Sequence, residues 1–326
     1  MKKKIINFQE GWAGVFAKLN MYIVACKEAE RLGYFPVPYW PSIWHDENID
    51  IWDIFFERIN HTVDDKKTLT EEINIVKLFA KREKDRHVNP APQFAGILRE
   101  PIDRQKCNQI IEANISLQPW LRQKIQSLYD THLNSHRVLG VHLRGPGKDK
   151  VGHGGVDRLN HLLGAGSPPF SKYFEIIDSK LEEYDYILLG TDAGMVQKTM
   201  RARYGDRILT VVSDQYELGE AHAKNRKVAN ISFNQLGMEA IVDAYLLSKC
   251  DFLIHGNSHL SNYVMCLAPH LKTQNVYEGL YDRASRIDMR LSSIWSKEIK
   301  PVIQHSFVGK IRVKLGQIKR QLTGKS

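Results

Sequence analysis

The chain has 326 residues, of which 43% are hydrophobic and 25% are charged, as is typical of a globular protein and not of a disordered one. This length accommodates two domains of ordinary size. The formal net charge is +9, but six basic residues and no acid lie in 310–326, so that 9 − 6 leaves about +3 for the rest. The charge therefore gives little support for a general nucleic-acid-binding surface.

The cysteines and the apolar segments indicate the compartment. No two cysteines have the close spacing of a zinc site or of a disulfide framework, so we expect free thiols in a reducing compartment; they are Cys26, Cys107, Cys250 and Cys266. The sequence turns polar directly after Ile6 and contains no run of about 18 apolar residues. We therefore expect a cytoplasmic protein that at most rests on a membrane, on the inner face of a bacterial inner membrane if the source is bacterial.

In the first half of the chain the pattern is irregular. A short strand is expected at 5–8, followed by a loop containing Gly11 and Gly14 and a helix over 15–32. The prolines in 35–38 favour an edge strand. An aromatic cluster follows, in which Trp40 and Trp44 either line an acceptor cleft or pack in the core. Two further helices are expected, over 103–115 and 120–133.

The second half alternates strands and helices. The expected strands are 138–144, 186–192, 207–212 and 252–255, and the expected helices are 170–181, 194–204 and 236–249. Such alternation predicts βαβ units and a parallel sheet covered on both faces. We therefore predict an α/β fold with an N-terminal α/β domain at 1–136, a second domain at 137–301 and a basic tail at 302–326.

Polar residues are expected at the carboxyl ends of these strands, where open parallel sheets bind ligands. Alternation along 138–144 places His142 and Arg144 on one face, where a guanidinium suits a phosphate, and the turn at Gly145 lets the backbone approach a bound donor closely. A surface arginine beside an ordinary turn would look the same. Asp243 lies in an apolar helix and needs a hydrogen-bond donor, which is either a structural partner or a base edge with two N–H groups.

A helix is expected to open with Ser258, His259 and Ser261, which either cap it or bind phosphate. Asp192 ends a strand, where it contacts a ribose, holds Arg144 or caps the next helix.

Several of these residues lie in stretches that resemble the motifs of a known enzyme family. His142-Leu-Arg144, Thr191-Asp192, and the run from Glu239 through Asp243 and Asp251 to Ser261 resemble three motifs of the fucosyltransferase superfamily. That superfamily includes the NodZ nodulation enzymes, the core α-1,6-fucosyltransferases and the protein O-fucosyltransferases. Order and spacing agree over 138–269, and the glycine loop is weakly similar.

The resemblance implies a GT-B fold, with two Rossmann-like domains facing across a cleft, and an inverting transfer from a GDP-sugar without a metal or another cofactor. It implies that Arg144 and Ser258 hold the β-phosphate, that His142 and Asp243 read guanine, and that the loop with Gly11 and Gly14 faces the diphosphate. The glutamate that acts as base in core fucosyltransferases is missing, so His153, Asp157 or no residue at all fills that role.

The acceptor is expected to be a glycan or a lipid-linked glycan of a bacterial surface. GDP-mannose as donor, or a non-catalytic glycan- or nucleic-acid-binding protein, are the alternatives. Basic and apolar residues alternate in the tail at helical spacing, which suits either an anionic membrane surface or packing on the body.

Overall fold

The computed structural model describes residues 2–7, 14–40, 50–59, 72–74, 102–143, 170–211, 233–256 and 258–276. The chain divides into two compact units, 1–277 and 278–326, and every described residue belongs to the first. The predicted boundary near residue 136 stays a prediction, and the basic tail lies outside the described residues.

A parallel sheet with strand order β2-β1-β3 forms the N-terminal part; it consists of β1 (Lys2–Asn7), β2 (Tyr34–Tyr39) and β3 (Glu72–Asn74). Helix α1 (Val15–Leu32) connects β1 to β2 and has the bounds that the sequence predicts. It ends at Gly33, whose φ of +69° lies in the left-handed region that favours glycine. The prolines of β2 are accommodated because this strand is at one end of the described sheet.

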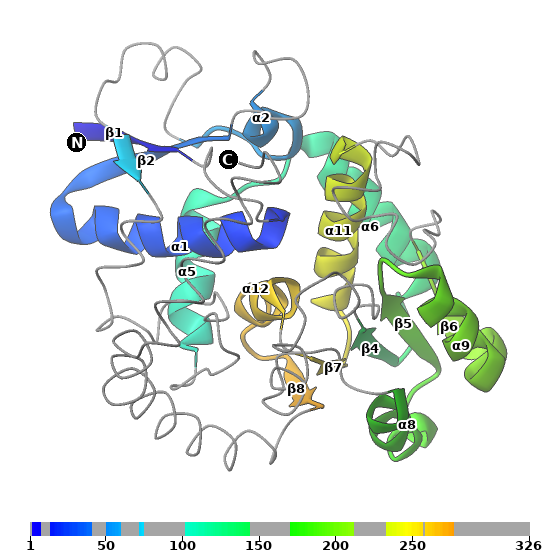
Figure 1. Cartoon of the computed structure of the whole chain (residues 1–326). Coiled ribbons are helices and arrows are strands. Elements are labelled where there is room, and N and C mark those ends of the chain that lie inside the picture. The colour runs from blue at the N-terminus through cyan, green and yellow to red at the C-terminus, as the bar shows by residue number, and fades with distance from the viewer. Residues whose placement is uncertain are drawn as a thin grey trace, which may run out of the picture. The chain divides into compact units, whose positions relative to one another are not determined.

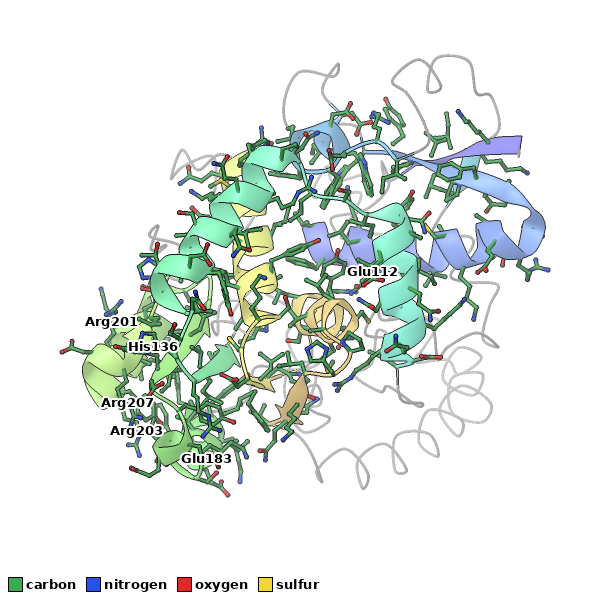
Figure 2. All side chains as sticks on the ribbon, turned by 180° about the vertical axis from the view of Figure 1, so that it is seen from behind. Glu112, His136, Glu183, Arg201, Arg203 and Arg207 are labelled. Carbon is green, nitrogen blue, oxygen red and sulfur yellow. The ribbon has the colours of Figure 1, made fainter. Side chains whose placement is uncertain are left out.

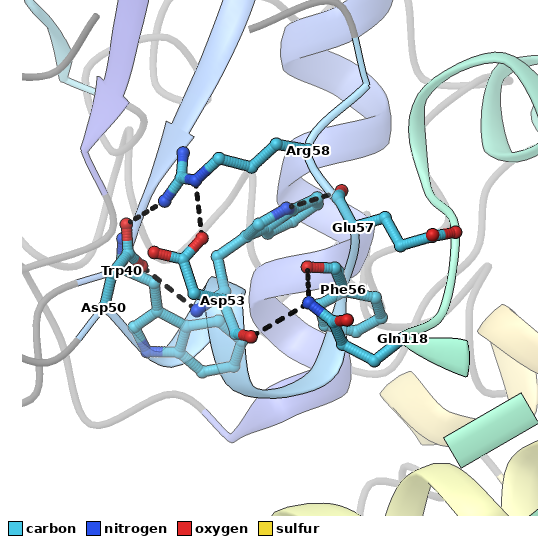
Figure 3. A network of polar contacts seen from close by, with 8 residues as sticks. Trp40, Asp50, Asp53, Phe56, Glu57, Arg58 and Gln118 are labelled. Carbon is cyan, nitrogen blue, oxygen red and sulfur yellow. Dashed lines mark hydrogen bonds and ion pairs between the residues drawn. The ribbon is translucent and has the colours of Figure 1, made fainter. Parts of the chain in front are cut away.

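A buried carboxylate organises the chain after β2 (Figure 3). Asp50 accepts hydrogen bonds from the backbone N–H groups of Trp40 and Trp52, both at 3.0 Å, and its second oxygen lies 2.9 Å from Nη2 of Arg58. Asp50 caps α2 (Ile51–Phe55), and Gln118 donates to two backbone carbonyls of the same segment. Trp40 is 1% exposed, so this member of the aromatic cluster packs in the core; Trp44 lies outside the described residues.

Two helices lead to the second sheet, α5 (Arg104–Asn114) and α6 (Pro119–His132), within two residues of their predicted bounds. The second sheet is parallel, with strand order β6-β5-β4-β7-β8. Its strands are β4 (Val138–His142), β5 (Tyr186–Gly190), β6 (Ile208–Leu209), β7 (Phe252–His255) and β8 (Lys272–Asn275). Strand β8 was not expected from its sequence, since Lys-Thr-Gln-Asn contains no apolar residue. It is an edge strand, and such a strand needs little apolar surface.

The helices of this part are α8 (Phe170–Asp178), α9 (Gly194–Tyr204), α11 (Phe233–Leu247) and α12 (His259–Leu267), with short 3₁₀ turns at Leu181–Glu183 and Gly205–Arg207. Figure 1 shows α11 on one side of the sheet and α8 on the other. Positions 140 and 190 face α11, because a Cβ at either glycine would meet Leu247. The predicted α/β class with parallel sheets is confirmed, and all four cysteines are buried and free.

Charged residues gather at the outer side of this sheet, around β5, α8 and α9 (Figure 2). Their side chains are used within the protein. Arg201 donates to the Thr210 hydroxyl, Arg203 pairs with Asp178, and Arg207 donates to backbone carbonyls that include that of Leu181. These arginines therefore hold the edge of the sheet together.

Candidate functional site

The carboxyl end of β4 meets the amino end of α12. His142, the last residue of β4, is 7% exposed, and its Nδ1 lies 2.8 Å from Oγ of Ser261 in a hydrogen bond. Ser258 Oγ lies 3.3 Å from the same nitrogen and 2.9 Å from Ser261 Oγ. Three predicted site residues thus form one hydrogen-bonded cluster, although 116 and 119 residues separate the serines from His142.

Ser258 is also a helix cap. Its Oγ accepts the backbone N–H of Ser261 at 2.9 Å, and its extended φ and ψ suit the N-cap of α12. The capping role left open by the sequence is therefore real. It does not exclude a second role, because the remaining N–H groups of the first turn still favour an anion.

Helix α1 secures this end of α12 from the N-terminal part of the chain. Asn20 is fully buried and its amide donates to the backbone carbonyl of His259 at 2.9 Å. Its Nδ2 also lies 3.4 Å from the ring nitrogen Nδ1 of His259. One turn earlier in α1, the Phe16 ring contacts Tyr263. The predicted site residue His259 is thus anchored to helix α1 by the Asn20 amide.

Three carboxylates lie together beside the cluster. Asp243 of α11 faces β5, and a Cβ placed on Gly190 would come within 3.7 Å of its Oδ2. Burial raises the pKa of Asp243 well above its usual value, and the neighbouring carboxylates Glu239 and Asp192 raise it further. Gly190 and His142 are register partners on adjacent strands, so Asp243 faces the strand next to that of His142. The part of the chain that the structure describes offers Asp243 no hydrogen bond or ion pair.

A second histidine lies in the same row. His255 of β7 is the register partner of His142 on its other side and is 3% exposed. Its Nδ1 lies 3.0 Å from the Gly256 carbonyl, so that this nitrogen carries the proton. Burial, together with the nearby Arg104 cation, lowers the pKa of His255 to about 4. It is therefore a neutral residue at physiological pH.

Several predicted site residues have no described position. Arg144, Gly145, His153, Asp157 and Gly11 lie outside the described residues, so their roles stay predictions. Gly14 is the N-cap of α1, and a Cβ there would meet nothing within 4 Å. Asp192 follows β5 at an exposed position, in electrostatic contact with Asp243. The N-cap of the following helix α9 is Ala193, with no side-chain cap, so Asp192 does not have the capping role that the sequence allowed. A contact with a ribose or with Arg144 stays a prediction.

Three residues of this region escaped the sequence analysis: Gly190, His255 and Asn20. They acquire their importance from neighbours far away in the sequence, which the sequence pattern does not identify. Glu239 opens the third motif, but its effect on the pKa of Asp243, one helical turn later, was not anticipated.

Within the described ranges, no group of three or more His, Cys, Asp or Glu side chains could hold a metal ion. A search of the same ranges finds no helix that is long and apolar enough to cross a membrane.

No protein-family model matches the sequence, and no curated protein matches it. Solved structures do match. A crystal structure of NodZ α-1,6-fucosyltransferase soaked with GDP-fucose is 17% identical over 82% of this chain and 94% of its own, with a TM-score of 0.51. The fucosyltransferase NodZ from Bradyrhizobium is 18% identical with the same coverage and TM-score. The chain therefore has a fucosyltransferase-like fold of the GT-B kind, as the motifs predicted.

Proposed function

We propose that this protein is a glycosyltransferase that moves fucose from GDP-fucose to a hydroxyl group of a glycan. The observation that carries the proposal is the cluster of His142, Ser258 and Ser261 at the carboxyl end of β4, within a fold shared with a GDP-fucose-soaked fucosyltransferase. The sequence motifs that resemble the superfamily contain all three of these residues, and the fold brings them into contact.

Recognition of the guanine base of the donor is the part of this proposal with the most support. A guanine base presents two adjacent N–H donors, and Asp243 is a poorly solvated carboxylate that lacks a hydrogen bond among the described residues. Two N–H donors would stabilise its ionised form, against the effect of burial and of Glu239. A uracil base has a single ring N–H and would satisfy Asp243 less well. This argument favours GDP over UDP.

The diphosphate is proposed to lie between the start of α12 and Arg144, which follows β4 by two residues. In the transfer, the acceptor oxygen attacks C1 of the sugar while the bond from C1 to the phosphate oxygen breaks. Negative charge then develops on the departing GDP, where Arg144 and the N–H groups of α12 stabilise it. This single displacement inverts the anomeric centre and is proposed to need no metal. The hydroxyl proton passes to His153, to Asp157 or to water; a general base contributes about 10²–10⁴-fold to the rate.

The setting is part of the same proposal. Synthesis of a bacterial surface polysaccharide or glycolipid would use a cytoplasmic donor and a lipid-linked acceptor. The basic residues of the tail at 310–326 suit an anionic membrane surface.

Calorimetric titration with GDP and with UDP tests the nucleotide assignment. We expect GDP to bind more tightly, and Asp243→Asn to remove the preference, while Asp130→Asn on the exposed side of α6 leaves it intact. Equal affinity for the two nucleotides would refute guanine recognition. Transfer assays with GDP-fucose and GDP-mannose then identify the sugar, and full activity of Arg144→Ala would remove the proposed phosphate contact.

A further inference from the structure

A buried lysine in the N-terminal part of the chain is unexplained by the proposed nucleotide site. Lys18, in the first turns of α1, is 6% exposed. Its ammonium lies 4.8 Å from the centroid of the Trp40 ring. Among the described residues, no carboxylate and no other acceptor pairs with its Nζ. A lysine is rarely this buried without a partner, because removing its charge from water is costly.

The cation–π contact offsets only part of that cost, since such contacts are weak compared with the cost of removing a charge from water. Burial lowers the pKa of Lys18 from 10.5 to about 8, so the side chain still carries its charge at neutral pH. The Trp40 ring is packed in the core, and its backbone is hydrogen-bonded on both sides. The Trp40 N–H is bonded to Asp50 (Figure 3), and the Trp40 carbonyl accepts the N–H of Ile51 at 2.8 Å.

The position of this cation in the fold suits an anion. Strand β1 leads into α1, and Trp40 directly follows β2, the parallel neighbour of β1. Lys18 therefore lies at the carboxyl end of the N-terminal sheet, the end where open parallel sheets bind ligands. Side chains in an α-helix lean toward its N-terminus, so that Lys18 leans toward the first turn of α1.

Among the described residues, that first turn also lacks a side-chain cap. The N-cap of α1 is Gly14, which forms no side-chain cap, and no acidic residue lies in the first turn. The free N–H groups give this end of the helix a partial positive charge. Two independent features, a buried unpaired ammonium and an uncapped helix terminus, thus favour negative charge at one place.

We propose that Lys18 and the N-terminus of α1 form a binding site for a phosphate or carboxylate group, built from residues that are not part of the His142 cluster. The proposed function offers two sources of that phosphate or carboxylate group, and the choice of these two sources rests on it. One is the diphosphate of the donor, reached from the N-terminal side. The other is an acidic group on the acceptor, such as a uronic acid or a lipid phosphate. The shared chemistry is an oxyanion that replaces the missing partner of Lys18.

Lys18→Met is the informative substitution, because methionine is unbranched and nearly as long as lysine but carries no charge. We expect the variant to unfold at the same temperature as the wild type or higher, since a buried unpaired charge is removed. We expect its affinity for inorganic pyrophosphate to fall by about tenfold, as is typical when a hydrogen bond to a charged group is lost. Lys18→Gln, which is also uncharged, serves as a second variant, and the exposed Lys124→Met on α6 is the matched control.

Two further titrations distinguish the sources. A loss of affinity for GDP but not for guanosine in Lys18→Met identifies the donor diphosphate. Unchanged affinity for GDP, together with weaker pyrophosphate binding and weaker binding of glucuronate than in the wild type, identifies an acidic acceptor. Pyrophosphate affinity equal to the wild type in both Lys18 variants would overturn the site. That result would leave the GDP–UDP comparison untouched, so failure of this proposal and failure of the proposed function are separable.

Discussion

Nδ1 of His142 lies 2.8 Å from Oγ of Ser261, which joins the last residue of β4 to the first turn of α12. Both residues are buried, and Ser258 Oγ is in contact with both partners. The hydrogen bond fixes the orientation of the imidazole ring at the carboxyl end of the central strand. His142 is thereby positioned before any ligand arrives.

Removal of the Ser261 hydroxyl should lower both stability and affinity. Ser261→Ala leaves a buried ring nitrogen with a weaker partner, and we expect a loss of about 1–2 kcal/mol in the free energy of unfolding. The affinity for GDP should fall as well, because the ring is less well oriented. Urea unfolding and calorimetry measure the two effects, with the exposed Ser127→Ala as control. Additive effects of Ser261→Ala and His142→Ala would contradict the coupling.

Ser258→Asp separates capping from ligand binding. Aspartate is a good N-cap, so the stability of α12 should be retained. Its negative charge would repel a diphosphate, and we expect the affinity for GDP to fall by at least about tenfold. Guanosine, which has no phosphate, should bind the variant and the wild type equally. If Ser258→Asp binds GDP normally, the start of α12 is a structural cap and no phosphate lies there.

Asp243→Asn should stabilise the protein while weakening nucleotide binding. The pKa of Asp243 is raised in the folded chain, so between its ordinary value and that raised value the native state holds more protons than the unfolded state. Stability therefore falls as the pH rises through this window. The variant should lose this dependence and be more stable than the wild type at pH 7. Urea unfolding at pH 5 and pH 8 tests the sign, and a destabilised variant would contradict it.

Gly190→Ala should disturb the sheet–helix contact near Asp243. The added Cβ would lie 2.9 Å from Cδ1 of Leu247, which is closer than a real Cβ contact. We expect a cost of about 1–3 kcal/mol, measured by denaturant unfolding. Because the obstacle is the end of a side chain, combination with Leu247→Ala should cost less than the sum of the two single substitutions. Gly14→Ala, whose Cβ meets nothing within 4 Å, has no such clash and changes only the N-cap of α1.

His255 should make the protein sensitive to acid. Its pKa is lowered from 6.5 to about 4 in the folded chain, so the unfolded state binds more protons between these values. Stability is then lost as the pH falls from 6.5 to 4, by up to about 3 kcal/mol. His255→Asn lacks this titration, and the difference between the two unfolding curves isolates it from the opposite contribution of Asp243. Parallel curves would show that the pKa of His255 is the same in the folded and unfolded states, which would contradict the prediction.

Much of the secondary structure follows from the sequence alone. Helix α1 and strand β7 have the predicted bounds because their apolar spacing and their glycine or turn signals are local. The parallel sheet was expected from the alternation of elements, and the cap at Ser258 from its position before an apolar helix. By contrast, β8 is polar and has no local strand pattern; its backbone pairs with β7 at the edge of the sheet.

The sequence by itself determined which residues are placed at the carboxyl ends of strands and at the starts of helices, because those positions depend on local periodicity. Only the tertiary structure decided which of them meet. It brought His142 into contact with Ser261 across 119 residues, and it placed Asp243 next to Gly190, which has no side chain. It also buried Lys18 against the Trp40 ring, with no described carboxylate as its partner. Such contacts arise where distant segments pack together, and the burial that they create sets the charge and the hydrogen-bonding needs of each group.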